Sequence, residues 1–101
     1  MEKIRLGIIG IGNMGSEHCR LILSGQTPEI ALTCVADPRQ DRRDWAQQTL
    51  PAGTGIYADG MSLIRAHACD AVLIATPHEL HPPLAEAALR AGLHVLSEKP
   101  A

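Results

Sequence analysis

The stretch from Ile4 to Gly15 reads IRLGIIGIGNMG and decides the fold of this chain. The run from Ile4 to Ile9 is rich in apolar, β-branched residues, too short for an ordinary helix, and bounded by glycine. It therefore predicts a fully buried parallel strand. Gly10-x-Gly12-x-x-Gly15 follows at once, and a helical pattern begins directly behind it.

This order of strand, glycine turn and helix is what the diphosphate of a dinucleotide requires. The first glycine permits a tight turn, the second lets phosphate approach bare backbone, and the third lets the helix pack close to the strand. The helix N-terminus adds unpaired N–H groups and a partial positive charge. The three glycines alone leave a second interpretation open, a purely structural turn.

A second apolar run, from Ile30 to Ala36, ends in Asp37. An acid at the end of the second strand, about 20 residues beyond the glycines, is where a ribose-binding carboxylate is expected. Such a carboxylate accepts both ribose hydroxyls of NAD and repels the 2′-phosphate of NADP. The alternative is that Asp37-Pro38 only begins a turn. Together the two runs, the glycines and the acid predict a dinucleotide-binding fold.

Composition narrows the class of protein. The chain has 101 residues, of which 46% are hydrophobic, enough for one small domain with a real core. Aromatic residues make up only 2%, which argues against a stacking platform for single-stranded nucleic acid. The net charge is −2 without a basic run, so we expect neither nucleic acid nor an anionic membrane as a partner. No apolar stretch approaches the ~20 residues of a membrane span.

Cys19, Cys34 and Cys69 are odd in number, widely spaced, and lie in apolar segments. This pattern predicts reduced core thiols, not a disulfide or zinc framework. The N-terminus leads straight into a strand without a signal-peptide pattern. We therefore expect a cytoplasmic protein.

Periodicity and turn residues predict helices over residues 13–24, 39–50, 60–67 and 83–91, and strands over residues 30–36, 55–58, 69–75 and 93–96. Gly25 and Gly92 are expected to end two of the helices, and Asp59 to cap another. Met14, Cys19, Leu21 and Ile22 are expected on the buried side of the first helix. The alternation predicts a Rossmann-like α/β fold, a doubly wound parallel sheet in a three-layer αβα arrangement that stops after about five strands.

Three arginines follow Asp37, and their roles differ. Arg39 lies two residues beyond the acid and could stack on adenine or pair with a 2′-phosphate, so NADP stays an alternative cofactor. Arg42 and Arg43 are interpreted as part of a solvated helix face. The pair His78-x-x-His81 has no further ligands at suitable spacing, so no metal site is predicted.

The motifs GIGNMG, AD at the end of the second strand, ATPHELH, and HVLSEKP resemble the N-terminal domain of the glucose–fructose oxidoreductase / inositol dehydrogenase / MocA oxidoreductase family. The resemblance covers nearly the whole chain, and Glu-Lys-Pro after the strand HVL is its most specific part. It implies an NAD(P)-binding Rossmann domain, spanning residues 1–101, of an oxidoreductase that moves hydride between nicotinamide and a sugar, polyol or related substrate.

The resemblance also implies individual roles. Gly10, Gly12 and Gly15, with the amides of Asn13 and Met14, would hold the diphosphate, and Asp37 the adenosine ribose. Thr76, Pro77, His78 and His81 would border the nicotinamide half. Glu98 and Lys99 would line the nicotinamide and substrate end, with Lys99 orienting the reacting hydroxyl, and Pro100 would often follow a cis peptide.

Members of this family continue past the lysine into more of the Rossmann fold and a second α/β domain. The resemblance therefore implies that this chain is a fragment that holds the cofactor half, and that the longer protein forms a homo-oligomer. We expect the 101-residue chain to bind the dinucleotide without catalysis. Two alternatives stay open at this point, an S-adenosylmethionine-dependent methyltransferase domain and a non-catalytic NAD(P)-binding regulatory or interaction module.

Overall fold

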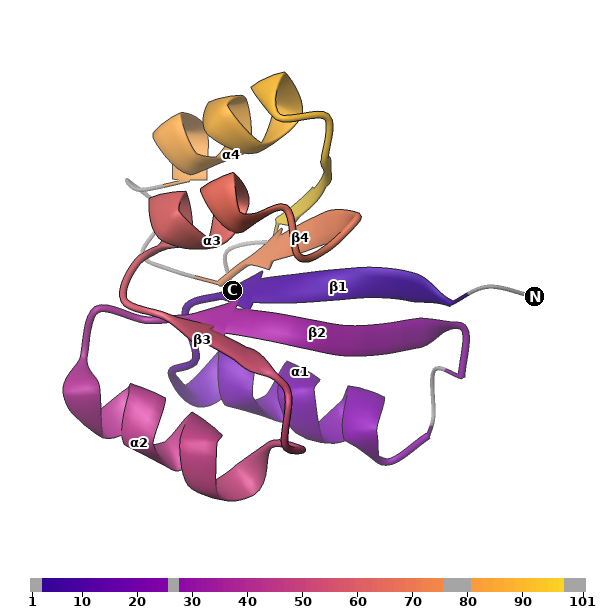
Figure 1. Cartoon of the computed structure of the whole chain (residues 1–101), viewed down its shortest axis with the longest axis vertical. Helices are drawn as coiled ribbons and strands as arrows, with labels where there is room; N and C mark the ends of the chain where they lie inside the picture. Colours follow the sequence, from indigo (N-terminus) through magenta and orange to yellow (C-terminus); the bar gives the residue numbers. More distant parts are fainter. Residues whose placement is uncertain (1–2, 26–27, 76–80, 98–101) are drawn as a thin grey trace.

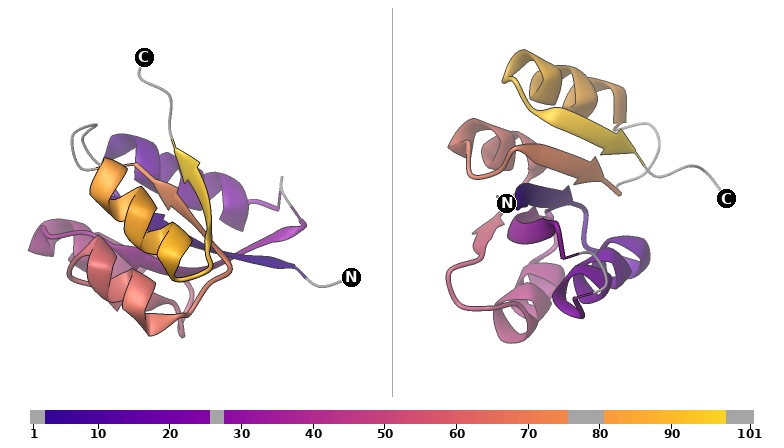
Figure 2. Two further views of the ribbon diagram at one scale, coloured as in Figure 1. Left: turned by 90° about the horizontal axis from the view of Figure 1, so that it is seen from above. Right: turned by 90° about the vertical axis from the view of Figure 1, so that its right-hand side faces the viewer.

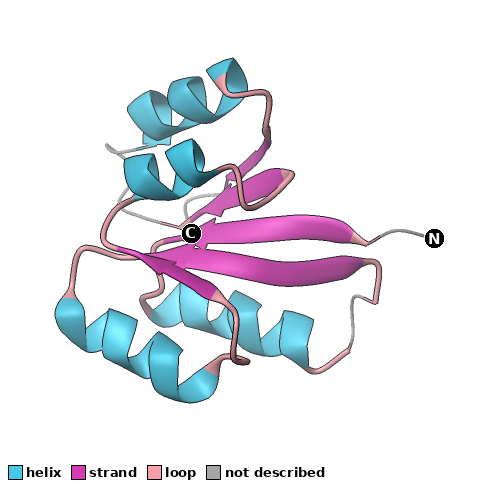
Figure 3. Ribbon diagram, viewed as in Figure 1, coloured by secondary structure: helices cyan, strands magenta, loops and turns pink. Residues whose placement is uncertain are grey.

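The computed structural model describes residues 3–25, 28–75 and 81–97. Strands and helices alternate along this part of the chain (Figure 1, Figure 3). They follow the order β1 (Ile4–Ile9), α1 (Asn13–Leu23), β2 (Ile30–Ala36), α2 (Gln40–Thr49), β3 (Gly55–Tyr57), α3 (Gly60–Ala66), β4 (Ala71–Ile74), α4 (His81–Arg90) and β5 (His94–Ser97).

The strands form one parallel five-stranded sheet in the order β3-β2-β1-β4-β5. Helices α1 and α2 cover one face, and α3 and α4 cover the other, as Figure 1 and both views of Figure 2 show. The two helix pairs lie on opposite faces because of the order of the strands. From β1 the chain adds β2 and then β3 on one side, and α3 then crosses back so that β4 and β5 are added on the other side of β1. The predicted Rossmann-like, doubly wound αβα architecture is confirmed.

The sheet separates two aliphatic clusters, because alternate side chains of a strand point to opposite faces. Ile8 and Val35 pack with Cys19 and Ala46 beneath α1 and α2. Ile9 belongs to the other cluster, beneath α3 and α4, whose further members include Cys34, Leu63, Val72, Ile74, Leu84 and Ala88. Within the described residues, no helix is both long enough and apolar enough to span a membrane.

The structure corrects the predicted burial of two apolar residues, Ile4 and Leu21. β1 is not buried throughout, because Ile4 is 49% exposed and Arg5 is also exposed. The guanidinium of Arg5 pairs with Asp70, at 2.9 Å between Nη2 and Oδ1, and this contact holds the pKa of Asp70 below its usual range. On α1, Leu21 was expected to face the core but is 44% exposed.

Most predicted boundaries hold within one or two residues. The strand expected from residue 69 begins at residue 71, and the helix expected from residue 83 begins at residue 81. Gly25 and Gly92 follow their helices with φ of 86° and 84°, a left-handed conformation that glycine adopts without strain. Asp59 caps α3 as predicted, because its Oδ1 accepts a hydrogen bond from the backbone N–H of Ser62 at 2.8 Å.

All three cysteines are free and buried, as predicted. Burial raises the pKa of Cys19 to about 11. Cys34 on β2 and Cys69 before β4 meet over Gly7, where a Cβ would lie 2.8 Å and 3.1 Å from their sulfurs. A hydrogen bond to Cys34, together with burial, raises the pKa of Cys69. Cys19 and Cys69 therefore stay protonated at neutral pH.

We predict that Gly15→Ala destabilises the chain by about 1–3 kcal/mol, the usual cost of adding a methyl group to a packed site. A Cβ at Gly15 would lie 2.8 Å from the carbonyl carbon of Gly10 and still closer to its oxygen, and neither backbone atom can turn aside. Urea unfolding measures the effect. Glu17→Ala, at an exposed position of the same helix, is the control, and equal stability of both variants would contradict this explanation of Gly15.

Candidate functional site

The candidate site lies where the order of the strands reverses. β1 is paired on one side with β2 and on the other with β4, so the connections that leave β1 and β4 run to opposite faces of the sheet. In open parallel sheets this divergence leaves a crevice outside the carboxyl ends of the strands. The glycine turn that follows β1 lies at this edge.

The turn presents backbone to the crevice. Gly10 has a φ of 94°, and its N–H donates to the carbonyl of Ala36 at 2.7 Å, which ties the turn to the end of β2. Gly12 is the N-cap of α1, and within the described chain no side chain caps the helix there. The first amides of α1 are therefore open to an anion, which a helix N-terminus favours.

Asp37 is held beside this turn. The residue is only 6% exposed, and its two carboxylate oxygens accept backbone hydrogen bonds from different elements. Oδ2 accepts from Ile11 N and Oδ1 from Arg39 N, each at 2.9 Å. Each oxygen keeps a second lone pair for a ligand. The carboxylate is thus fixed between the glycine turn and the start of α2, where it can accept the hydroxyls of a sugar.

The three arginines after Asp37 are arranged differently from the sequence interpretation. Arg39 pairs with Asp41, at 3.1 Å between Nε and Oδ1, and both side chains are 64% exposed. Arg43 is half-buried, and its Nη1 donates to the backbone carbonyl of Asp37 at 2.8 Å. Arg42 is also half-buried, with its guanidinium against Gly12. The solvated helix face predicted for Arg42 and Arg43 is therefore wrong.

An apolar cavity of about 290 Å³ lies at the same edge, on the α3 and α4 side of the sheet. Its lining comes from the ends of β1 and β2 and the starts of α3 and α4, namely Ile9, Ala36, Pro38, Asp59, Gly60, Met61, Pro83 and Leu84. Cavities of this size and character suit a flat heterocycle. Sequence reasoning missed this lining because its members are spread from residue 9 to residue 84 and carry no shared motif.

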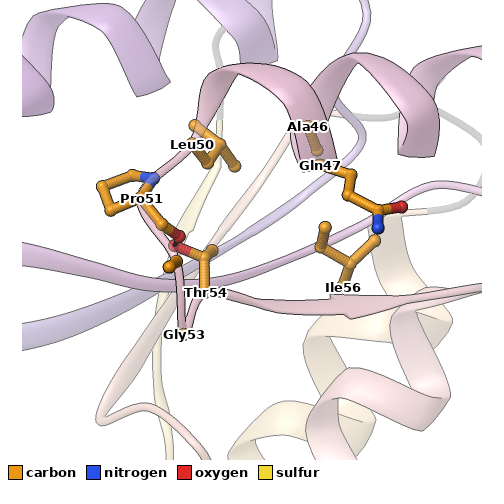
Figure 4. Close-up of a pocket in the computed structure, with 8 residues that line it drawn as sticks. Ala46, Gln47, Leu50, Pro51, Gly53, Thr54 and Ile56 are labelled. Atoms are coloured by element: carbon orange, nitrogen blue, oxygen red, sulfur yellow. Dashed lines mark hydrogen bonds between the residues drawn. The ribbon is translucent and has the colours of Figure 1, made fainter.

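A larger hollow of about 640 Å³ lies elsewhere, and we call it the amino-edge hollow. Figure 4 shows it between the C-terminal end of α2 and the beginning of β3, with Gln47, Pro51, Thr54 and Ile56 around it. The Thr54 hydroxyl donates its proton to the carbonyl of Pro51 at 2.8 Å, so this donor is already used within the loop. The amino-edge hollow opens at the opposite edge of the sheet from the glycine turn and is not part of the site.

Several predicted site residues lie outside the described part of the chain, namely Thr76, Pro77, His78, Glu98, Lys99 and Pro100. His81 is the first residue of α4, and Asn13 and Met14 begin α1. The structure thus brings together the glycine turn, Asp37 and the backbone of Arg39. Across residues 3–25, 28–75 and 81–97, no group of three or more His, Cys, Asp or Glu side chains is placed to hold a metal ion.

Comparisons with known proteins agree with this geometry. Residues 4–101 match the profile described as "Oxidoreductase family, NAD-binding Rossmann fold". The chain is 38% identical over 102 residues to inositol 2-dehydrogenase 4 of Saccharopolyspora erythraea, covering 98% of this chain and 29% of that protein. It is 36% identical over 108 residues to a glycosyl hydrolase family 109 protein of the same organism, covering 99% of this chain and 23% of that protein.

Among solved structures, the scyllo-inositol dehydrogenase of Lactobacillus casei with bound NAD(H) and scyllo-inositol superimposes with a TM-score of 0.89. Its sequence is 31% identical, and the match covers 98% of this chain and 28% of that one. The chain therefore spans less than a third of the length of these relatives.

The fold and the carboxyl-edge site define an NAD-binding Rossmann domain. The chain belongs to the glucose–fructose oxidoreductase / inositol dehydrogenase / MocA oxidoreductase family, the family that its sequence motifs already resemble.

We predict that the stability contributed by Asp59, the N-cap of α3 at the rim of the apolar cavity, depends on pH. The hydrogen bond from Ser62 N holds the pKa of Asp59 below its usual value, so the stability that the cap contributes is present at neutral pH and is lost as pH falls through the folded-state pKa. At pH 7, Asp59→Ala should cost about 1 kcal/mol. Below about pH 4, where an ordinary Asp titrates, that difference should shrink.

Asp59→Asn is the matched variant, because asparagine caps a helix about as well as aspartate and does not titrate. Its stability should equal that of the wild type at pH 7 and exceed it in acid. Urea unfolding from pH 2.5 to 7 makes the measurement. A pH-independent gap between the wild type and Asp59→Ala would show that the charged cap is not what stabilises α3.

Proposed function

We propose that this chain binds NAD across the carboxyl edge of its sheet, with the adenosine half over β1 and β2. The backbone at Gly10, Gly12 and Gly15, with the amides of Asn13 and Met14, holds the diphosphate. Asp37 accepts the hydroxyls of the adenosine ribose, and the apolar cavity receives the adenine. The observation that carries this assignment is the buried Asp37 carboxylate, oriented by Ile11 N–H and Arg39 N–H beside an uncapped helix N-terminus.

The nicotinamide half would then extend toward the ends of β4 and β5. For this half the assignments are those that the family motifs imply, with Thr76, Pro77, His78 and His81 along the nicotinamide ribose and Glu98 and Lys99 near the ring. Nicotinamide supplies the hydride chemistry when it is bound. Lys99 would orient the hydroxyl or carbonyl oxygen of the substrate and is the catalytic residue proposed for this chain.

For the longer protein of which this chain would be the cofactor domain, residues 1–101, we propose an NAD-dependent oxidoreductase that acts on CH–OH groups of inositols or related sugars and polyols. The support is the similarity to inositol dehydrogenases in sequence and in structure. Because a relative named as a glycosyl hydrolase shares the same domain, the reaction depends on groups outside it. We further propose a cytoplasmic homo-oligomer, with buried free thiols as the support for the compartment.

The methyltransferase alternative has no support, because the matched family is one of oxidoreductases. NAD is the cofactor of this family's fold, and we propose that NADP is the weaker ligand. Asp37 supports this preference, since a buried carboxylate repels a 2′-phosphate. Arg39 is less suited to bind that phosphate than its place in the sequence indicates, because Asp41 already neutralises its guanidinium.

We predict that the 101-residue chain binds NADH and that excitation of Trp45, the single tryptophan, gives sensitised NADH emission that unlabelled NAD displaces. With inositol and NAD, the chain alone should produce no NADH, whereas the longer protein proposed above should. Binding by both forms without turnover of any inositol, sugar or polyol would favour a regulatory module instead. Absence of binding would overturn the proposed function.

We predict that Asp37→Ser weakens NAD binding by about tenfold or more, because a charged hydrogen-bond acceptor for the ribose is lost. Discrimination against NADP should fall at the same time. Asp44→Ser removes an exposed acid from α2, the helix that follows Asp37, and is the control. Unfolding curves of the variant should be measured as well, because the substitution also removes the hydrogen-bond acceptor of the buried Ile11 N–H and is expected to lower stability. Tighter binding of NADP than NAD by the unmodified chain would contradict the role of Asp37.

A further inference from the structure

The second glycine of the turn is covered by a cation. A Cβ built on Gly12 would collide with Nη1 of Arg42 and would lie 3.2 Å from its Cζ and 3.6 Å from its Nη2. The second glycine of this motif lacks a side chain so that phosphate can reach the backbone. The guanidinium of Arg42, which belongs to α2, therefore stands in the approach of the diphosphate.

The arginines near Arg42 already have partners of their own. Arg39 forms its ion pair with Asp41, and Arg43 donates to the carbonyl of Asp37 and to Oε1 of Gln40 at 2.7 Å. Arg20 lies over the ring of Trp45, 5.7 Å from the centroid. Among the described residues, the side chain of Arg42 has no hydrogen bond or ion pair. Its charge is therefore available to an anion at the glycine turn.

There is also room for Arg42 to move. A hollow of about 260 Å³ opens between α1 and α2, and it is lined by Ile11, Gly12, Ser16, Arg20, Asp41, Arg42 and Trp45. The Arg42 side chain can therefore move away from Gly12 within this space without a change in the backbone of α2. It then lies beside a phosphate at the turn and can donate charge-assisted hydrogen bonds to it.

We propose that Arg42 is a phosphate-binding residue of this domain, covering Gly12 in the free protein and moving aside to clamp the diphosphate when the dinucleotide binds. This inference rests on the proposed NAD site and adds to it a contact from α2, a helix that the glycine motif does not include. The clamp acts on the phosphate held at the turn, not on a 2′-phosphate. Arg42 therefore contributes equally to NAD and NADP.

Arg42→Gln tests the proposal, because glutamine keeps polarity and most of the length but loses the charge. Its affinity for NAD, NADP and ADP-ribose should fall by about tenfold, the effect of one charged hydrogen bond, while its affinity for adenosine is unchanged. Binding should also become less sensitive to salt than in the wild type. Arg90→Gln is the matched control, since it removes one exposed arginine charge from the end of α4.

Trp45 provides a second readout, because it lines the same hollow as Arg42. Titration of the wild type with ADP-ribose, which lacks nicotinamide and cannot accept energy, should change Trp45 emission as the guanidinium moves, and Arg42→Gln should show a smaller change. A merely structural arginine would alter stability but not the difference between ADP-ribose and adenosine.

Three outcomes would overturn the inference. Tighter NAD binding by Arg42→Gln would show that Arg42 blocks the diphosphate site and opposes cofactor binding. A loss of affinity confined to NADP would show that Arg42 binds the 2′-phosphate. Unchanged affinities would show that its position over Gly12 has no role in cofactor binding. Each of these requires that the wild type binds NAD. Failure of the wild type to bind is the separate result that overturns the proposed function.

Discussion

The site depends on how closely the backbone of α1 approaches the end of β1. At Gly15 no side chain fits, because a Cβ would collide with the carbonyl group of Gly10. This contact fixes the direction of α1 and hence the direction of its first N–H groups toward the crevice. The positive φ of Gly10 completes the turn, and its N–H anchors the turn to Ala36 at the end of β2. Steric exclusion at two glycines thus creates an electrostatic feature, a preorganised anion cradle.

Asp37 extends this cradle across two strands. Its carboxylate joins Ile11, in the turn after β1, to Arg39, the N-cap of α2. A buried carboxylate needs such partners, because burial without hydrogen bonds is costly. The same hydrogen bonds that stabilise the buried charge also fix the orientation of the carboxylate beside the glycine turn. Structural support and the proposed recognition of the ribose therefore come from one group, and a change at Asp37 is expected to affect both.

The two faces of the sheet contribute different chemistry at one edge. On the α3 and α4 side, the apolar cavity is formed where the ends of β1 and β2 meet the starts of two helices. On the α1 and α2 side, the glycine turn meets the half-buried Arg42, whose side chain is unpaired among the residues that the structure describes. A dinucleotide has the same division, with an apolar base, a polar sugar and an anionic diphosphate. The arrangement follows from the reversal of strand order, which opens both faces at the same point.

The sequence alone determined the order of elements, the glycine turn, the acid after β2, the Asp59 cap and the family, because these depend on local spacing and on residues with restricted conformations. It misjudged Leu21, and it misjudged Arg42 and Arg43, because exposure depends on which helix packs beside which. Only the tertiary structure decided that Arg42 lies on Gly12 and that Arg39 pairs with Asp41. The lining of the apolar cavity was likewise fixed only by folding, since parallel strands bring residues from 9 to 84 to one edge.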